Sequence, residues 1–158
     1  MRVPKIYLET SVFNFVFADD APDKRQDILK LFEEIKEGKY EPYTSDYVLG
    51  ELQRASEPKQ SQMMDLIGKY GITVLFADDE VNRLASTYIA EGIIPARYFT
   101  DAAHIAITTV NDINIIASYN FQHIVKRKTV TMTEIVNLRE GYHKIGIFSP
   151  TEVIESDE

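Results

Sequence analysis

Residues 6–11, Ile-Tyr-Leu-Glu-Thr-Ser, place an acidic side chain where a short apolar strand passes into a helix. The run from Lys5 to Leu8 is β-prone and apolar, which predicts a buried strand. Thr10 and Ser11 follow it as candidate helix caps. Glu9 lies between the two, and a carboxylate that ends an apolar strand is costly to bury without a partner. The segment therefore predicts a strand-to-helix turn with a functional acid at Glu9.

Apolar runs and amphipathic segments alternate along the rest of the chain. Short β-prone runs predict further strands at 41–44, 72–76, 113–117 and 145–148. Between them, apolar residues spaced three and four apart predict helices. The expected helix starts include Ala21, Ser45 or Asp46, Asp78 or Asp79, Thr100, and Thr131 or Thr133. This alternation predicts one α/β domain over residues 1–158, with a mostly parallel central sheet.

Composition limits the functional classes. The 158 residues are 44% hydrophobic and 27% charged, which is typical of a globular domain rather than a disordered or membrane protein. There is no apolar run of the ~20 residues that a membrane span needs and no signal-peptide core, so we expect a cytoplasmic protein without membrane contact. The absence of cysteine excludes disulfides and thiolate zinc sites. A net charge of −8 disfavours broad binding to nucleic acid, although a local basic patch is compatible with it.

Three acids and one amide from separate segments are candidates for a shared site. The carboxyl ends of parallel strands form the ligand crevice of an open sheet, and Glu9 and Asn120 follow two predicted strands. Asp101 falls in the first turn of its helix, where the helix dipole favours a carboxylate. With Glu51, these acids offer the oxygen ligands that Mg²⁺ or Mn²⁺ prefers, and Asn120 adds a neutral oxygen or positions water or phosphate. Such a site is suited to phosphodiester hydrolysis.

Several of these residues also have a structural interpretation. Glu51 could be a solvated helix residue, and Asp101 could be a first-turn capping acid. His104 lies on an apolar helix face, which favours a hydrogen-bonded structural histidine. His123 is interpreted as an exposed residue that could meet a phosphate. Tyr7 is expected to pack its ring while its hydroxyl stays in water.

Five segments, in order along the chain, resemble PIN-domain proteins. Residues 7–11, Tyr-Leu-Glu-Thr-Ser, resemble the family's opening motif, and 49–52, Leu-Gly-Glu-Leu, are similar to the segment around its second acid. Residues 100–106, Thr-Asp-Ala-Ala-His-Ile-Ala, resemble the block around the third acid. Residues 118–124, Ser-Tyr-Asn-Phe-Gln-His-Ile, and 147–152, Ile-Phe-Ser-Pro-Thr-Glu, resemble segments of one bacterial branch. The likeness spans nearly the whole chain.

The resemblance implies a three-layer α/β/α fold and a Mg²⁺- or Mn²⁺-dependent ribonuclease, often the toxin of a VapC-type toxin–antitoxin pair and usually a homodimer. Glu9, Glu51 and Asp101 would be the acid ligands, and Asn120 would occupy the fourth acid position. Glu9 replaces the commoner Asp and Asn120 replaces an acid, although both recur in this branch. The alternative is a catalytically silent PIN module that binds RNA or a protein partner.

Basic residues near these segments are candidates for RNA contact. Lys126, Arg127 and Lys128 follow Asn120 closely, and Arg97 precedes Asp101 by one helical turn. With His123, they could contact an RNA backbone. The alternative is that they are solvated surface charges.

Overall fold

The sheet of this protein is parallel throughout. The computed structural model describes residues 2–155, and within them five strands are ordered β3-β2-β1-β4-β5. The strands are β1 (Lys5–Leu8), β2 (Glu41–Ser45), β3 (Thr73–Leu75), β4 (Ile115–Ala117) and β5 (Gly146–Phe148). The central strand β1 is covered on both faces, and its residues Ile6, Tyr7 and Leu8 are fully buried. The predicted parallel sheet is confirmed.

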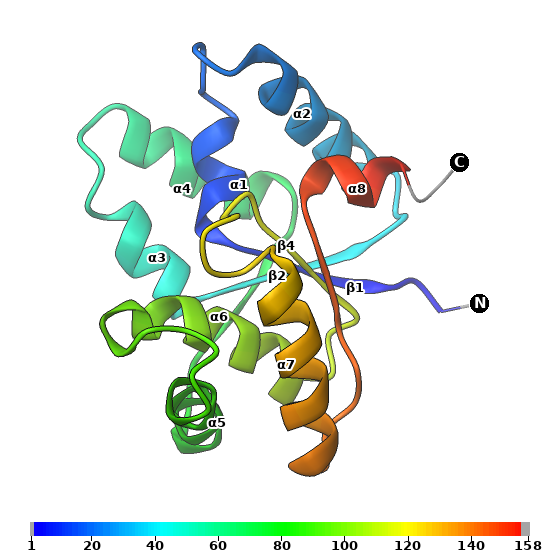
Figure 1. Ribbon diagram of the computed structural model, residues 1–158. Coiled ribbons are helices and arrows are strands. Elements are labelled where there is room, and N and C mark those ends of the chain that lie inside the picture. Colours follow the sequence, from blue (N-terminus) through cyan, green and yellow to red (C-terminus); the bar gives the residue numbers. More distant parts are fainter. Residues whose placement is uncertain (1, 156–158) are drawn as a thin grey trace.

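Helices cover both faces of the sheet. They are α1 (Thr10–Phe15), α2 (Pro22–Lys36), α3 (Asp46–Leu52), α4 (Lys59–Lys69), α5 (Asp79–Ala90), α6 (Phe99–Val110), α7 (Arg127–Arg139) and α8 (Pro150–Glu155), with a short 3₁₀ turn, η1, at Ala96–Tyr98. Figure 1 shows α1, α2, α4 and α8 on one side of the strands and α5, α6 and α7 on the other. This arrangement confirms the expected three-layer α/β/α fold.

The strand order reverses between β1 and β4, which is where a parallel sheet is expected to bind a ligand. The chain moves outward from β1 through β2 to β3, and then returns to the opposite side of β1 to form β4 and β5. Parallel sheets bind ligands where the strand order reverses, at the carboxyl ends of the strands. The backbone N–H of Glu9 donates to the carbonyl of Ala117, at 3.2 Å, and so joins these two ends. Residues that follow β1 and β4 are therefore neighbours.

Two predicted helix caps are confirmed and two other helix starts differ from the prediction. Ser45 and Asp78 accept hydrogen bonds from the first turns of α3 and α5, as expected. Helix α6 begins at Phe99 without a side-chain cap, because η1 leads into it, so the cap predicted at Thr100 is wrong. Helix α7 begins at Arg127 rather than at Thr131 or Thr133. Its buried face includes Thr129, Thr133 and Asn137, so apolar periodicity does not mark its first turn.

Helix α6 connects the core to the site. Every residue from Ala102 to Thr109 is buried, whereas Asp101, in its first turn, is partly exposed. Its burial against α5 fixes the direction in which that first turn points. Among the described helices, α6 included, none combines the length and apolarity needed to cross a membrane.

Candidate metal-binding site

Glu9 is a buried carboxylate held by hydroxyl groups. It is the N-cap of α1, a role predicted for Thr10 or Ser11, and it is 4% exposed. Its Oε1 accepts hydrogen bonds from the Ser11 N–H (3.2 Å), the Ser11 hydroxyl (2.7 Å) and the Ser118 hydroxyl (2.5 Å). Among the described residues all of its donors contact Oε1, so Oε2 has no protein partner. A buried acid requires hydrogen-bond donors, and here two serines supply them: Ser11, in the helix after β1, and Ser118, directly after β4.

Glu51 is fixed on α3 by two donors and is not a freely solvated residue. Its Oε1 accepts from the Thr10 hydroxyl at 2.5 Å and lies 2.8 Å from Nε2 of His104. Burial raises the pKa of Glu51. The hydrogen bond from His104 and its charge lower that pKa by more, so the pKa lies below the ordinary value. Glu51 is therefore a carboxylate at neutral pH.

His104 connects Glu51 to the centre of the sheet. It is fully buried, and its Nδ1 lies 2.7 Å from the Tyr7 hydroxyl, which in turn lies 2.7 Å from the Ser45 hydroxyl. Burial lowers the pKa of His104, but the hydrogen bond to Glu51 and the charges of the nearby acids raise it above the ordinary value. Both ring nitrogens are engaged, which confirms the structural interpretation of His104. The prediction of a solvated hydroxyl on Tyr7 is wrong, because Ser45 and His104 take the place of water.

Asp101 is held by the second histidine. Its Oδ2 lies 2.9 Å from Nδ1 of His123, and its side chain is 14% exposed. The His123 ring packs against that of Tyr98, with centroids 4.0 Å apart, and His123 is only 7% exposed. The expectation that His123 is an exposed residue is therefore wrong, because Tyr98 covers it. Asp101 itself is oriented rather than free.

Two of the three predicted acid ligands form one tight group. Ligand atoms of Glu9, Glu51 and His104 all lie within 4.8 Å of one another. Asp101 is outside that group, but it lies three residues before His104 and so projects from the same face of α6. Because both nitrogens of His104 are engaged, we assign the cation-binding capacity of this group to the two glutamates.

The donor set fits a hard divalent cation. Glu9, Glu51 and Asp101 each have one oxygen fixed by protein donors and one oxygen without a donor among the described residues. Within the same part of the chain, neither Lys nor Arg forms an ion pair with these three acids. Oriented carboxylate oxygens are what Mg²⁺ and Mn²⁺ bind.

Asn120 supports the same corner of the site. Its Oδ1 accepts from the His123 N–H at 3.0 Å, and its own N–H donates to the Ser118 hydroxyl at 2.9 Å. Asn120 thus fixes the turn that carries His123. Sequence reasoning did not identify the orienting roles of Thr10, Ser11 and Ser118. These three hydroxyl residues lie close to Glu9 or Asn120 in the sequence, and that proximity could have indicated their roles.

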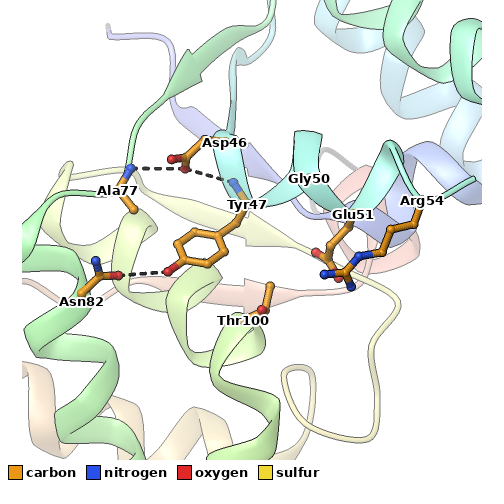
Figure 2. Close-up of a pocket in the computed structure, with 8 residues that line it drawn as sticks. All are labelled: Asp46, Tyr47, Gly50, Glu51, Arg54, Ala77, Asn82 and Thr100. Atoms are coloured by element: carbon orange, nitrogen blue, oxygen red, sulfur yellow. Dashed lines mark hydrogen bonds between the residues drawn. The ribbon is translucent and has the colours of Figure 1, made fainter.

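A pocket opens beside Glu51. It has a volume of about 400 Å³ and is lined by Asp46, Tyr47, Gly50, Glu51, Arg54, Ala77, Asn82 and Thr100. Figure 2 shows Glu51 of α3 and Arg54, which follows the end of that helix, on the same side of the pocket, with Thr100 of α6 nearby. Tyr47 is fixed by a 3.1 Å hydrogen bond from its hydroxyl to Asn82. The pocket therefore places one cation, Arg54, next to the acid group.

The predicted basic residues lie on the other side of Asp101. Lys126, Arg127 and Lys128 are exposed at the start of α7, where the positive end of the helix dipole adds to their field. Lys126, Lys128 and His123 line a second pocket, of about 440 Å³. Arg97 is exposed and stacks over the Tyr98 ring at 5.0 Å, and this ring covers His123. The basic residues thus adjoin the Asp101 corner of the site.

Comparison with known proteins identifies the fold. No protein-family model matches the sequence, and a search of curated proteins finds no match. Among solved structures, VapC20 of Mycobacterium tuberculosis, described as a sarcin–ricin loop cleaving toxin, has a TM-score of 0.55 and 13% identity, covering 89% of this chain and 98% of its own. VapBC2 of Rickettsia felis, solved with a DNA fragment from its promoter, has a TM-score of 0.53 and 16% identity, covering 73% of this chain and 88% of its own. The chain has the fold of these VapC-type PIN-domain proteins.

Proposed function

We propose that this protein is a metal-dependent endoribonuclease that hydrolyses RNA phosphodiester bonds. The observation that carries the proposal is the set of three carboxylates, Glu9, Glu51 and Asp101, each with one oxygen oriented and one free. They stand at the strand-order reversal of a fold that also occurs in a ribonuclease toxin. The alternative, a silent module that binds RNA, predicts no need for three such acids.

Glu9, Glu51 and Asp101 would hold one or two Mg²⁺ or Mn²⁺ ions. A bound divalent cation supplies a water of lowered pKa and stabilises negative charge on the phosphate. The chain's own residues then do the positioning: the Ser11 and Ser118 hydroxyls aim Glu9, and the two histidines aim the other acids. Such orienting groups tune metal affinity. Asn120, in the fourth acid position, contributes an amide instead of a charge.

The same proposal assigns the partners. The exposed Arg97, Lys126, Arg127 and Lys128 contact the RNA, which offsets the net charge of −8 locally. The buried His123 reaches the RNA only where it lines the pocket beside Lys126 and Lys128. A protein antitoxin restrains the activity, the chain forms a homodimer, and the protein acts in the cytoplasm. A small protein encoded next to this gene that co-purifies with the chain and suppresses cleavage would support the toxin assignment.

Cleavage of single-stranded RNA tests the central claim. Wild-type protein should cleave RNA in Mg²⁺ or Mn²⁺ and lose activity in EDTA. Glu9→Gln and Asp101→Asn should each abolish cleavage, whereas Asp65→Asn, which changes an exposed acid on α4, should not. RNA binding without metal-dependent cleavage by the wild type would instead support the silent module.

A further inference from the structure

Three aromatic rings form a platform beside the candidate site. Phe15, at the end of α1, and Tyr119 have ring centroids 4.9 Å apart, and those of Tyr119 and Phe121 are 6.1 Å apart. Phe121 is 49% exposed, although it directly follows Asn120. Phe121 belongs neither to the buried core nor to the residues packed against it, so its ring is accessible to a ligand.

A single lysine lies over all three rings. The Lys24 Nζ is 5.3 Å from the ring centroid of Phe15, 5.4 Å from that of Tyr119 and 5.5 Å from that of Phe121. Lys24 is half-buried, and among the described residues it forms no ion pair. Its charge is therefore held at the rings by cation–π attraction rather than by an ion pair.

The platform is rigidly tied to the acid group. The Tyr119 N–H donates to the Ser11 hydroxyl at 2.8 Å, and that hydroxyl donates to Glu9 at 2.7 Å. At its other end, the Tyr119 hydroxyl lies 3.0 Å from the Thr151 hydroxyl. Two hydrogen bonds thus connect the Tyr119 backbone to the Glu9 carboxylate, and Phe121 follows Tyr119 by two residues.

We propose that Phe15, Tyr119 and Phe121, with Lys24, form a stacking site for one base of single-stranded RNA next to the cleaved phosphate. This inference rests on the proposed ribonuclease function. Lys24 already occupies the cationic position over the rings, so a cationic ligand is repelled. A ligand that combines a flat π-face with negative charge is favoured, and a nucleotide has both. Aromatic stacking with a nearby cation is the usual way in which proteins bind single strands without sequence preference.

Fluorescence of 2-aminopurine tests the stacking directly. The probe is a 12-nucleotide oligouridine carrying one 2-aminopurine, placed at each position in turn and measured in Ca²⁺ with intact RNA verified on gels. Wild-type protein should quench the probe at one or two adjacent positions. Phe121→Ala should abolish that quenching and weaken binding roughly 5- to 150-fold. Phe121→Tyr should restore both, and Leu138→Ala, an exposed apolar residue on α7, should match the wild type.

Lys24→Gln separates the charge from the stack. It should lower the salt-dependence slope of binding by about 0.7, the value for one single-strand phosphate, and leave quenching in place. If the Phe121→Ala variant binds RNA and quenches the probe as the wild type does, the proposed stacking site is wrong. RNA cleavage measured in parallel keeps the two proposals apart: cleavage that is normal in Phe121→Ala but lost in Glu9→Gln leaves the ribonuclease standing without the platform. Quenching without cleavage leaves the platform standing without the ribonuclease, and a wild type that neither binds nor cleaves overturns both.

Discussion

Each acid of the candidate site accepts a hydrogen bond from a neighbouring side chain. His123 illustrates this arrangement, since its ring connects Asp101 to Tyr98 and its backbone N–H connects it to Asn120. Groups that orient a metal ligand are typically worth 10- to 100-fold in metal affinity or activity. We therefore expect metal affinity at this site to depend on its histidines and serines as well as on its acids.

Replacing His123 tests the orienting role at Asp101. His123→Leu removes the hydrogen bond and keeps an apolar side chain against Tyr98, so Mn²⁺ affinity and RNA cleavage should both fall about 10- to 100-fold. Calorimetric titration with Mn²⁺ and a cleavage assay measure the two effects. His143→Leu, at an exposed histidine, is the matched control. Unchanged Mn²⁺ affinity in His123→Leu would mean that Asp101 does not need this partner.

Ser118 serves two partners at once. Its hydroxyl donates to Glu9 and accepts from the Asn120 N–H. Ser118→Ala leaves a buried carboxylate with fewer donors and a backbone N–H without an acceptor, so stability should fall by about 1–3 kcal/mol. Urea denaturation measures this loss, with Ser61→Ala, at an exposed serine of α4, as the control. A loss equal to that of the control would show that the Ser11 donors suffice for Glu9.

Asn120 is the position where one atom changes the charge of the site. Asn120→Asp keeps the Oδ1 that accepts from His123 and adds a negative charge near three acids. Divalent-ion affinity should rise on the order of tenfold. Calorimetric titration of the variant and of the wild type with Mn²⁺ measures this difference in affinity. If affinity does not change, the side chain does not face the cation, and its place as the fourth acid position fails.

At the scale of elements, the sequence predicted what periodicity and capping chemistry control. β1 and the caps at Ser45 and Asp78 were predictable, because a short apolar run and a capping side chain are local signals. The start of α7 was not, because three of its four buried residues, Thr129, Thr133 and Asn137, are polar, and Thr129 and Asn137 are held by side-chain hydrogen bonds to His123 and Thr109. Elements whose buried face is polar are hidden from hydrophobic periodicity.

Because α7 begins at Arg127, the basic residues Lys126, Arg127 and Lys128 lie at the N-terminus of a helix. Three cations at a helix N-terminus oppose the helix dipole, each at a cost of about 0.3–1 kcal/mol at exposed sites. Replacing Lys126, Arg127 and Lys128 with Ala should therefore leave thermal stability equal or higher while weakening RNA binding. The salt-dependence slope should fall by about 0.7 for each phosphate that the variant no longer neutralises. The same slope and affinity in mutant and wild type would place the RNA path elsewhere, and Mn²⁺ affinity should not change in either case.

At the scale of the molecule, the sequence predicted which segments meet better than how their side chains are held. Glu9 and Asn120 follow adjacent parallel strands, so strand topology alone brings their segments together. The pairing of Glu51 with His104 and of Asp101 with His123 spans 53 and 22 residues respectively, and no local pattern encodes such distances. Burial of the two imidazoles favours these partners, because a buried ring nitrogen needs a hydrogen-bonding group.

Metal binding should stabilise the whole fold, because Glu9 and Glu51 lie close together, Asp101 projects from the same face of α6 as His104, and among the described residues none of these acids forms an ion pair with Lys or Arg. A cation that binds only the folded state adds about 2.7 kcal/mol when its concentration is 100 times its Kd. The melting temperature should therefore rise with Mn²⁺ and fall back on addition of EDTA. The double variant Glu9→Gln with Asp101→Asn should melt at or above the metal-free wild-type temperature, because the mutual repulsion of the acids is relieved. It should show no shift with Mn²⁺, whereas Asp65→Asn should shift as the wild type does. A wild type whose melting temperature is the same with millimolar Mn²⁺ and with EDTA would contradict a metal site built on these acids.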